Sequence, residues 1–128
     1  MVTAISQGIQ ISVEVHYQPE YSNPILLEFM HAYKINILNY NSFAVQLLRR
    51  HWYIVNSSCS KKEVEGEGVI GVQPIIQPNQ QYEYVSGCNL TTEIGKMYGH
   101  YTMENLYNKS LFKVAIPPFN LVYPYKNN

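Results

Sequence analysis

The sequence predicts an all-β protein, an antiparallel β-sandwich of about seven to eight strands. Apolar and polar residues alternate in several short segments, which is typical of strands that bury one face. Clusters of Gly, Pro, Asn and Ser separate these segments, as turns do in an antiparallel sheet. No window of helical length carries apolar residues at the three-and-four spacing of an amphipathic helix.

The first three predicted strands span residues 9–17, 29–37 and 45–55. In the second of them, His31 shares a face with aromatic and aliphatic residues. We expect its imidazole to be buried and uncharged, because burial disfavours the charged form. In the third, the apolar face changes side, which predicts a bulge near residues 48–50.

The remaining predicted strands span residues 61–65, 81–86, 97–104 and 111–116. The last of them is expected to end before Pro117-Pro118. An antibody-type domain would place its tryptophan between two disulfide-bonded cysteines. Here Trp52 precedes both cysteines, so that disulfide is absent.

Length and charge exclude several classes of protein. The 128 residues suffice for one domain with one core, so residues 1–128 are expected to form a single domain. Nine Lys and Arg balance nine Asp and Glu, which gives no net field toward nucleic acid or an anionic membrane. No apolar run is long enough to span a bilayer. Without an apolar signal region after Met1, we expect a cytoplasmic protein in which Cys59 and Cys88 are free thiols.

Residues 66–71 read Gly-Glu-Gly-Val-Ile-Gly, the G-x-G-x-x-G spacing of dinucleotide-binding turns. A pyrophosphate site of that kind needs the glycines to open a helix, whose N-terminus binds the anion. Pro74, Pro78 and the β-branched residues between them make a helix unfavourable there. We interpret the glycines as a bend with positive φ angles or a bulge where the chain changes sheets. Weak phosphate binding by a backbone nest stays open, although residues 63, 65 and 67 are glutamates that would oppose an anion.

The only compact cationic group is Arg49-Arg50-His51. Alternation along a strand places Arg50 and Trp52 on one face and His51 on the other. A solvated strand end is the ordinary role of such a group. If Arg50 meets the glycine loop in space, the two would form a site for an anion or an acidic peptide, because guanidinium binds carboxylate and phosphate through a planar fork. The candidate ligand-binding residues are therefore Arg50, His51, Gly66, Gly68 and Gly71.

The sequence predicts no catalytic residues, no metal site and no cofactor. The four histidines lie on separate predicted elements without the short spacing of metal ligands. A nucleophile at Cys88 with His51 or His100 as its base has no local support, and a small buried thiol is the simpler interpretation.

Several segments, taken in order, resemble the bacterial ApaG family. They are Tyr17-Gln18-Pro19-Glu20-Tyr21-Ser22-Asn23-Pro24, Arg50-His51-Trp52, Gly66-Glu67-Gly68-Val69-Ile70-Gly71-Val72-Gln73-Pro74, Ser86-Gly87-Cys88 and Ile116-Pro117-Pro118-Phe119. The resemblance covers a core of about residues 8–121. It implies a fibronectin type III or immunoglobulin-like β-sandwich with no established enzyme activity and a role in protein interaction. The family also carries an association with cobalt and magnesium homeostasis, and its genes often neighbour a diadenosine-tetraphosphate hydrolase.

The leading hypothesis is a non-enzymatic β-sandwich module that binds another protein. A homodimer through open edge strands is a related expectation, with Pro117-Pro118 or the two lysines at residues 61 and 62 protecting an edge that stays free. The alternative is a sensor that binds a phosphate-bearing nucleotide at the glycine loop, with Arg50 and His51 as counter-charges. A weaker alternative is a cobalt or magnesium homeostasis protein.

Overall fold

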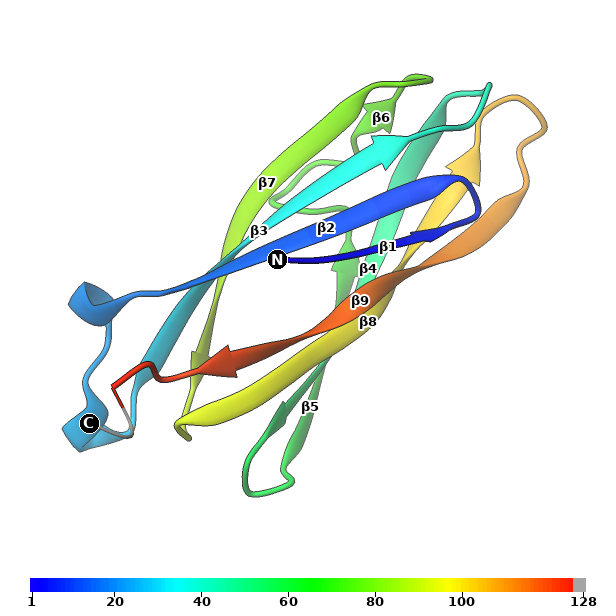
Figure 1. Cartoon of the computed structure of the whole chain (residues 1–128). Helices are drawn as coiled ribbons and strands as arrows, with labels where there is room; N and C mark the ends of the chain where they lie inside the picture. The colour runs from blue at the N-terminus through cyan, green and yellow to red at the C-terminus, as the bar shows by residue number, and fades with distance from the viewer. Residues whose placement is uncertain (126–128) are drawn as a thin grey trace.

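The computed structural model describes residues 1–125, which form two antiparallel sheets packed face to face (Figure 1). The first sheet has the order β1-β2-β3-β7 and the second has the order β5-β4-β8-β9, with β6 also paired to β4. The strands are β1 (Val2–Ser6), β2 (Ile9–Tyr17), β3 (Phe29–Asn39), β4 (Val45–Asn56), β5 (Lys61–Glu67), β6 (Ile75–Ile76), β7 (Gln81–Leu90), β8 (Ile94–Asn105) and β9 (Leu111–Val122). The predicted all-β sandwich is confirmed.

The core lies between the sheets and is built from the alternating residues of each strand. In β2 and β3, the apolar residues predicted to share a face do point inward and are buried or half-buried. Trp52 of the second sheet packs edge-on against Tyr33 and Phe119, with ring centroids 5.5 and 5.8 Å apart. Each such buried large side chain contributes about 1.5–3 kcal/mol of hydrophobic stabilisation.

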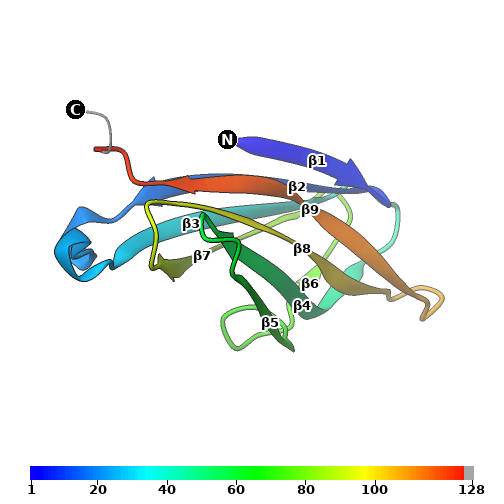
Figure 2. The ribbon, with the colours of Figure 1, turned by 90° about the horizontal axis from the view of Figure 1, so that it is seen from below.

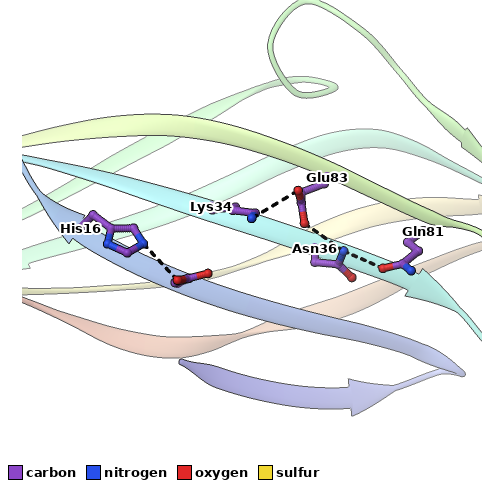
Figure 3. A network of polar contacts seen from close by, with 6 residues as sticks. His16, Lys34, Asn36, Gln81 and Glu83 are labelled. Carbon is purple, nitrogen blue, oxygen red and sulfur yellow. Dashed lines mark hydrogen bonds and ion pairs between the residues drawn. The ribbon is translucent and has the colours of Figure 1, made fainter.

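The outer face of the first sheet is polar. Lys34 Nζ lies 3.5 Å from a carboxylate oxygen of Glu83, and the amide of Asn36 donates to Gln81 and to Glu83 (Figure 3). These exposed cross-strand pairs join β3 to β7 on the solvent side. The sheet is therefore half-buried, which is the reason for the strict alternation in its sequence.

The predicted bulge in β4 is confirmed at Leu48. The register with β8 runs from Leu47 opposite Met103 directly to Arg49 opposite Thr102, so Leu48 is the extra residue. Before the bulge, odd-numbered residues of β4 face the core, and after it even-numbered residues do. The bulge consequently turns both Arg50 and Trp52 toward the space between the sheets.

The prediction that the last strand ends before Pro117-Pro118 is wrong. Strand β9 continues to Val122, and the prolines lie in a bulge between Ile116 opposite Gly99 and Phe119 opposite Met97. In the described residues β9 pairs only with β8, so the missing N–H groups of the prolines cost no ladder hydrogen bond. Figure 2 shows β9 running beside β2 of the other sheet, which closes one side of the sandwich.

The predicted loop between β2 and β3 contains two short 3₁₀ turns, η1 (Pro19–Tyr21) and η2 (Pro24–Leu26). This loop exposes four large apolar side chains, those of Tyr21, Ile25, Leu26 and Leu27. Within residues 1–125, no helix has the length and apolar character needed to cross a bilayer.

His31 is buried, as expected, with 1% of its surface exposed. It faces the core from β3, opposite Tyr17 of β2 and Cys88 of β7. Burial lowers the pKa of its imidazole, which is therefore neutral at physiological pH.

Because the pKa of His31 is lower in the folded chain than in the unfolded chain, acid should destabilise the fold. As the pH falls through about 6.5, the unfolded chain binds a proton at His31 that the folded chain does not bind. We expect the free energy of unfolding to fall more steeply between about pH 7.5 and pH 5 in the wild type than in His31→Phe, by up to about 1.4 kcal/mol per pH unit. Urea unfolding across that range measures the difference. Parallel curves for the two proteins would contradict it.

Candidate functional site

A cleft opens between the two sheets on the side where β7 ends one sheet and β5 borders the other. It consists of two adjoining hollows of about 310 and 160 Å³, which share Tyr33, Arg50, Trp52 and Ser86. We call it the β5–β7 cleft. Trp52 and Tyr33 form its apolar floor and are 2% and 6% exposed, whereas Arg50 is half-buried.

Arg50 and the glycine loop meet in this cleft. Nη1 of Arg50 donates to the backbone oxygens of Glu67 and Gly68, both at 3.0 Å. The guanidinium lies over Gly66, where an added Cβ would come within 2.8 Å of its nitrogens. Gly66 therefore provides the space that lets Arg50 reach across β5.

The other two glycines of the G-x-G-x-x-G spacing form a bend. Gly68 has a φ of 59°, and an added Cβ would lie 1.9 Å from the carbonyl oxygen of Val72. Ile70 and Gly71 have φ angles of 47° and 76°, the two consecutive positive angles of a type I′ turn. The chain then rejoins β4 as β6, so no helix opens here and both segments stay in one sheet. The interpretation as a bend is confirmed, but the expected change of sheet at this point is wrong.

The backbone of this loop already has hydrogen-bond partners. The N–H of Gly68 donates to Leu48, and the N–H groups of Val69 and Val72 each donate to the other's carbonyl. Three donors that a phosphate nest would need are thus used within the chain. Any anion in the cleft would depend on side-chain cations.

His51 lies on the opposite face, as the alternation predicts. Its Nδ1 is 2.7 Å from a carboxylate oxygen of Glu65, and its Nε2 is 3.3 Å from one of Glu63. Its ring stacks on Tyr53 at 4.6 Å and lies 5.1 Å from the ring of His100. The structure therefore does not bring His51 to Arg50. Glu63 and Glu65, two of the three glutamates expected to oppose an anion, therefore also lie on this outer face, away from the cleft.

A second cation in the β5–β7 cleft, Lys62, is absent from the sequence-based candidates. It shares a face of β5 with Val64 and Gly66, and this alternation could have identified it. Lys61 points the other way, with its Nζ 4.6 Å from the centre of the Tyr53 ring. Arg50 and Lys62 together give the cleft a positive wall suited to a carboxylate or a phosphate.

Two further titratable groups of the cleft, Tyr84 and Cys88, stay protonated at neutral pH. The hydroxyls of Tyr84 and Tyr101 are hydrogen-bonded to each other, and burial raises the pKa of both. Burial also raises the pKa of the Cys88 thiol, so little of the nucleophilic thiolate is present at neutral pH. Cys59 and Cys88 are both free, as predicted. In residues 1–125, no group of three or more His, Cys, Asp or Glu side chains is arranged to hold a metal ion.

Comparison with known proteins identifies the family. Residues 19–105 match the family model described as the ApaG domain. The protein named Protein ApaG from Sinorhizobium fredii is 42% identical over 124 residues, which cover 97% of this chain and 95% of the relative. The one from Edwardsiella ictaluri is 43% identical over 116 residues, covering 91% and 92%.

Solved structures agree with this result. The crystal structure of the putative ApaA protein from Bordetella pertussis superposes with a TM-score of 0.88 at 38% identity, covering 92% of this chain and 95% of that chain. An X-ray structure of a structural-genomics target gives a TM-score of 0.87 at 34% identity, covering 98% and 94%. A protein from Archaeoglobus fulgidus, with a TM-score of 0.53 at 8% identity, shares the fold alone.

Ile70 is a strained position whose relief should stabilise the chain. It is β-branched, 60% exposed and held at a positive φ that asparagine adopts more readily. We expect Ile70→Asn to raise the free energy of unfolding by about 1 kcal/mol, measured by urea unfolding. Ile70→Val keeps the β-branch and should show no gain. Equal stability of the Asn and Val variants would show that the turn stores no such strain.

Proposed function

The chain belongs to the ApaG family, and we propose that it is a non-enzymatic binding module whose partner is another protein. One observation carries this proposal. Strand β7, which among the described residues pairs only with β3, borders a cleft whose opposite wall carries Arg50 and Lys62. An unpaired edge beside a cationic cleft suits an extended, acidic segment of a partner.

The partner segment would bind as an additional strand on β7. Its backbone would pair with the free edge, and its alternate side chains would point between the sheets. Within residues 1–125, Arg50 uses only Nη1 for hydrogen bonds, which leaves Nη2 and Nε for a carboxylate. An acidic side chain at the matching position would therefore bind both cations of the cleft.

The rim of the cleft supports a macromolecular partner. The type I′ turn presents Ile70 and Val72, which are 60% and 48% exposed. Exposed apolar side chains beside a polar cleft are typical of protein interfaces. They would cover the apolar residues that flank the acidic ones in the partner strand.

Peptide selection tests the proposal. A displayed library of random peptides as long as β7, which has 10 residues, is selected on the full-length protein. We expect the selected peptides to alternate acidic with β-branched residues, and a synthetic one to shift the backbone amide signals of β7 in an NMR titration. The double variant Arg50→Gln/Lys62→Gln should bind it at least about tenfold more weakly, because both charge-assisted contacts are lost.

The matched control is Arg49→Gln/Lys61→Gln, which removes the same charge from neighbouring positions on the outer face. It should bind like the wild type. Because Arg50 also supports the glycine loop, Lys62→Gln alone is measured as well, together with the melting temperature of each variant. Equal binding by both double variants, or shifts at β1 in place of β7, would refute the proposal. A second copy paired along β7 would instead appear as a concentration-dependent dimer in sedimentation without peptide.

A phosphate-bearing nucleotide is the second candidate for the β5–β7 cleft, favoured by the same pair of cations. His51 lies on the outer face, and three N–H groups of the glycine loop are already bonded within the chain. Arg50 and Lys62 would therefore hold the phosphates. Trp52 and Tyr33 would offer the cleft floor to the base.

Calorimetry with ATP, GTP and diadenosine tetraphosphate tests the second candidate. Nucleotide binding predicts a saturable heat that disappears in Arg50→Gln/Lys62→Gln and persists in Arg49→Gln/Lys61→Gln. The heat should also weaken as salt is raised, because the phosphates are held by charge. Absence of heat with all three nucleotides would exclude nucleotide binding. It would not contradict the proposal that the cleft binds a peptide.

A further inference from the structure

A second cavity, of about 460 Å³, lies on the opposite side of the sandwich from the β5–β7 cleft. It exists because β1 is short. Strand β1 pairs with β2 only as far as Val13, so residues 14–17 of β2 have no strand on that side. There β2 approaches β9 of the other sheet, and the space between them is lined by Val15, Val122 and Pro124.

His31 lines this cavity from β3, and its position is chemically unusual. Its Nε2 is buried and has no hydrogen-bond partner among residues 1–125. A buried polar group without a partner destabilises the fold, because it has lost its hydrogen bonds to water and gained none in the protein. An apolar side chain would fill the position without that cost, as Phe29, Tyr33 and Ile35 do at the neighbouring inward positions of the same strand. A ligand group that bonds the imidazole would remove the penalty.

The lining indicates an uncharged ligand with an aromatic ring. It contains no Lys, Arg, Asp or Glu, so a charged ligand would lose its hydration without gaining an ion pair. The Tyr17 ring lies edge-on to the His31 ring at 5.3 Å and to the Tyr125 ring at 6.1 Å. Aromatic walls of this kind favour a further ring in an offset or edge-to-face arrangement.

A hydroxyl group matches the remaining requirement. A neutral imidazole carries one donor and one acceptor nitrogen, and a hydroxyl both donates and accepts, so it satisfies Nε2 in either tautomer. We propose that this cavity binds a small uncharged molecule that joins an aromatic ring to a hydroxyl group, with the hydroxyl bonded to Nε2 of His31 and the ring against Tyr17. The cavity volume lies within the range of small-molecule sites.

An NMR titration of the full-length protein, labelled with ¹⁵N in its histidines, tests the proposal with phenol, toluene and benzoate as probes. Phenol should shift the His31 ring signals saturably. Toluene, which lacks the hydroxyl, should bind at least about tenfold more weakly, and benzoate should not bind, because it is charged.

Two variants carry the same substitution, one inside the cavity and one outside it. His31→Phe keeps an aromatic ring but loses the hydrogen bond, so phenol should bind it at least about tenfold more weakly while toluene binds as before. His100→Phe is the control, because the His100 ring lies 5.1 Å from the His51 ring on the outer face of the second sheet and does not line this cavity, and phenol binding should be unchanged. Melting temperatures establish that each variant folds. If His31→Phe does not fold, the ratio of phenol to toluene affinity in the wild type decides.

Two results would overturn the proposal. Equal affinity for phenol and toluene would show that the cavity selects rings without using His31. His31 signals that respond to none of the three probes would show that no ligand of this kind reaches the imidazole.

Discussion

The two hydrogen bonds from Nη1 of Arg50 to the carbonyls of Glu67 and Gly68 determine how the β5–β7 cleft is built. They hold the last residues of β5 beside β4, and they keep a guanidinium between the sheets, where a charge without polar partners would be costly. Gly66 is necessary for this contact because any side chain there would occupy the space of the guanidinium. The cationic wall of the cleft and the bend of the glycine loop are therefore one structural unit.

That unit depends in turn on the bulge at Leu48. Without the extra residue, the second half of β4 would present His51 to the core and Arg50 to solvent, because a shift of one residue exchanges the faces of a strand. The bulge thus separates two chemically distinct surfaces of the second sheet. The inner surface carries Arg50 and Trp52, and the outer surface carries His51 with its two glutamates.

Much of this arrangement could be predicted from the sequence, because half-buried strands show their faces through alternation. The bulge, the burial of His31 and the opposite directions of Arg50 and His51 all follow from that period. Strand β1 could not be predicted in this way, because Ile5 is exposed and Ser6 is half-buried, the reverse of what their polarity suggests. Strand β6 has too few residues to show any period. The cleft and the second cavity depend on which strand edges meet across the sandwich and on where β1 ends, and no local pattern encodes either.

The two thiols of the chain lie in contrasting surroundings. Cys59 is exposed in the turn between β4 and β5, whereas Cys88 is buried in the cleft, with its pKa raised by that burial. Reagents that attack the thiolate should therefore mark the native chain at one place without any engineered cysteine. A fluorophore attached at Cys59 would stand at the start of β5, and its emission would report events at that edge of the sandwich as they occur.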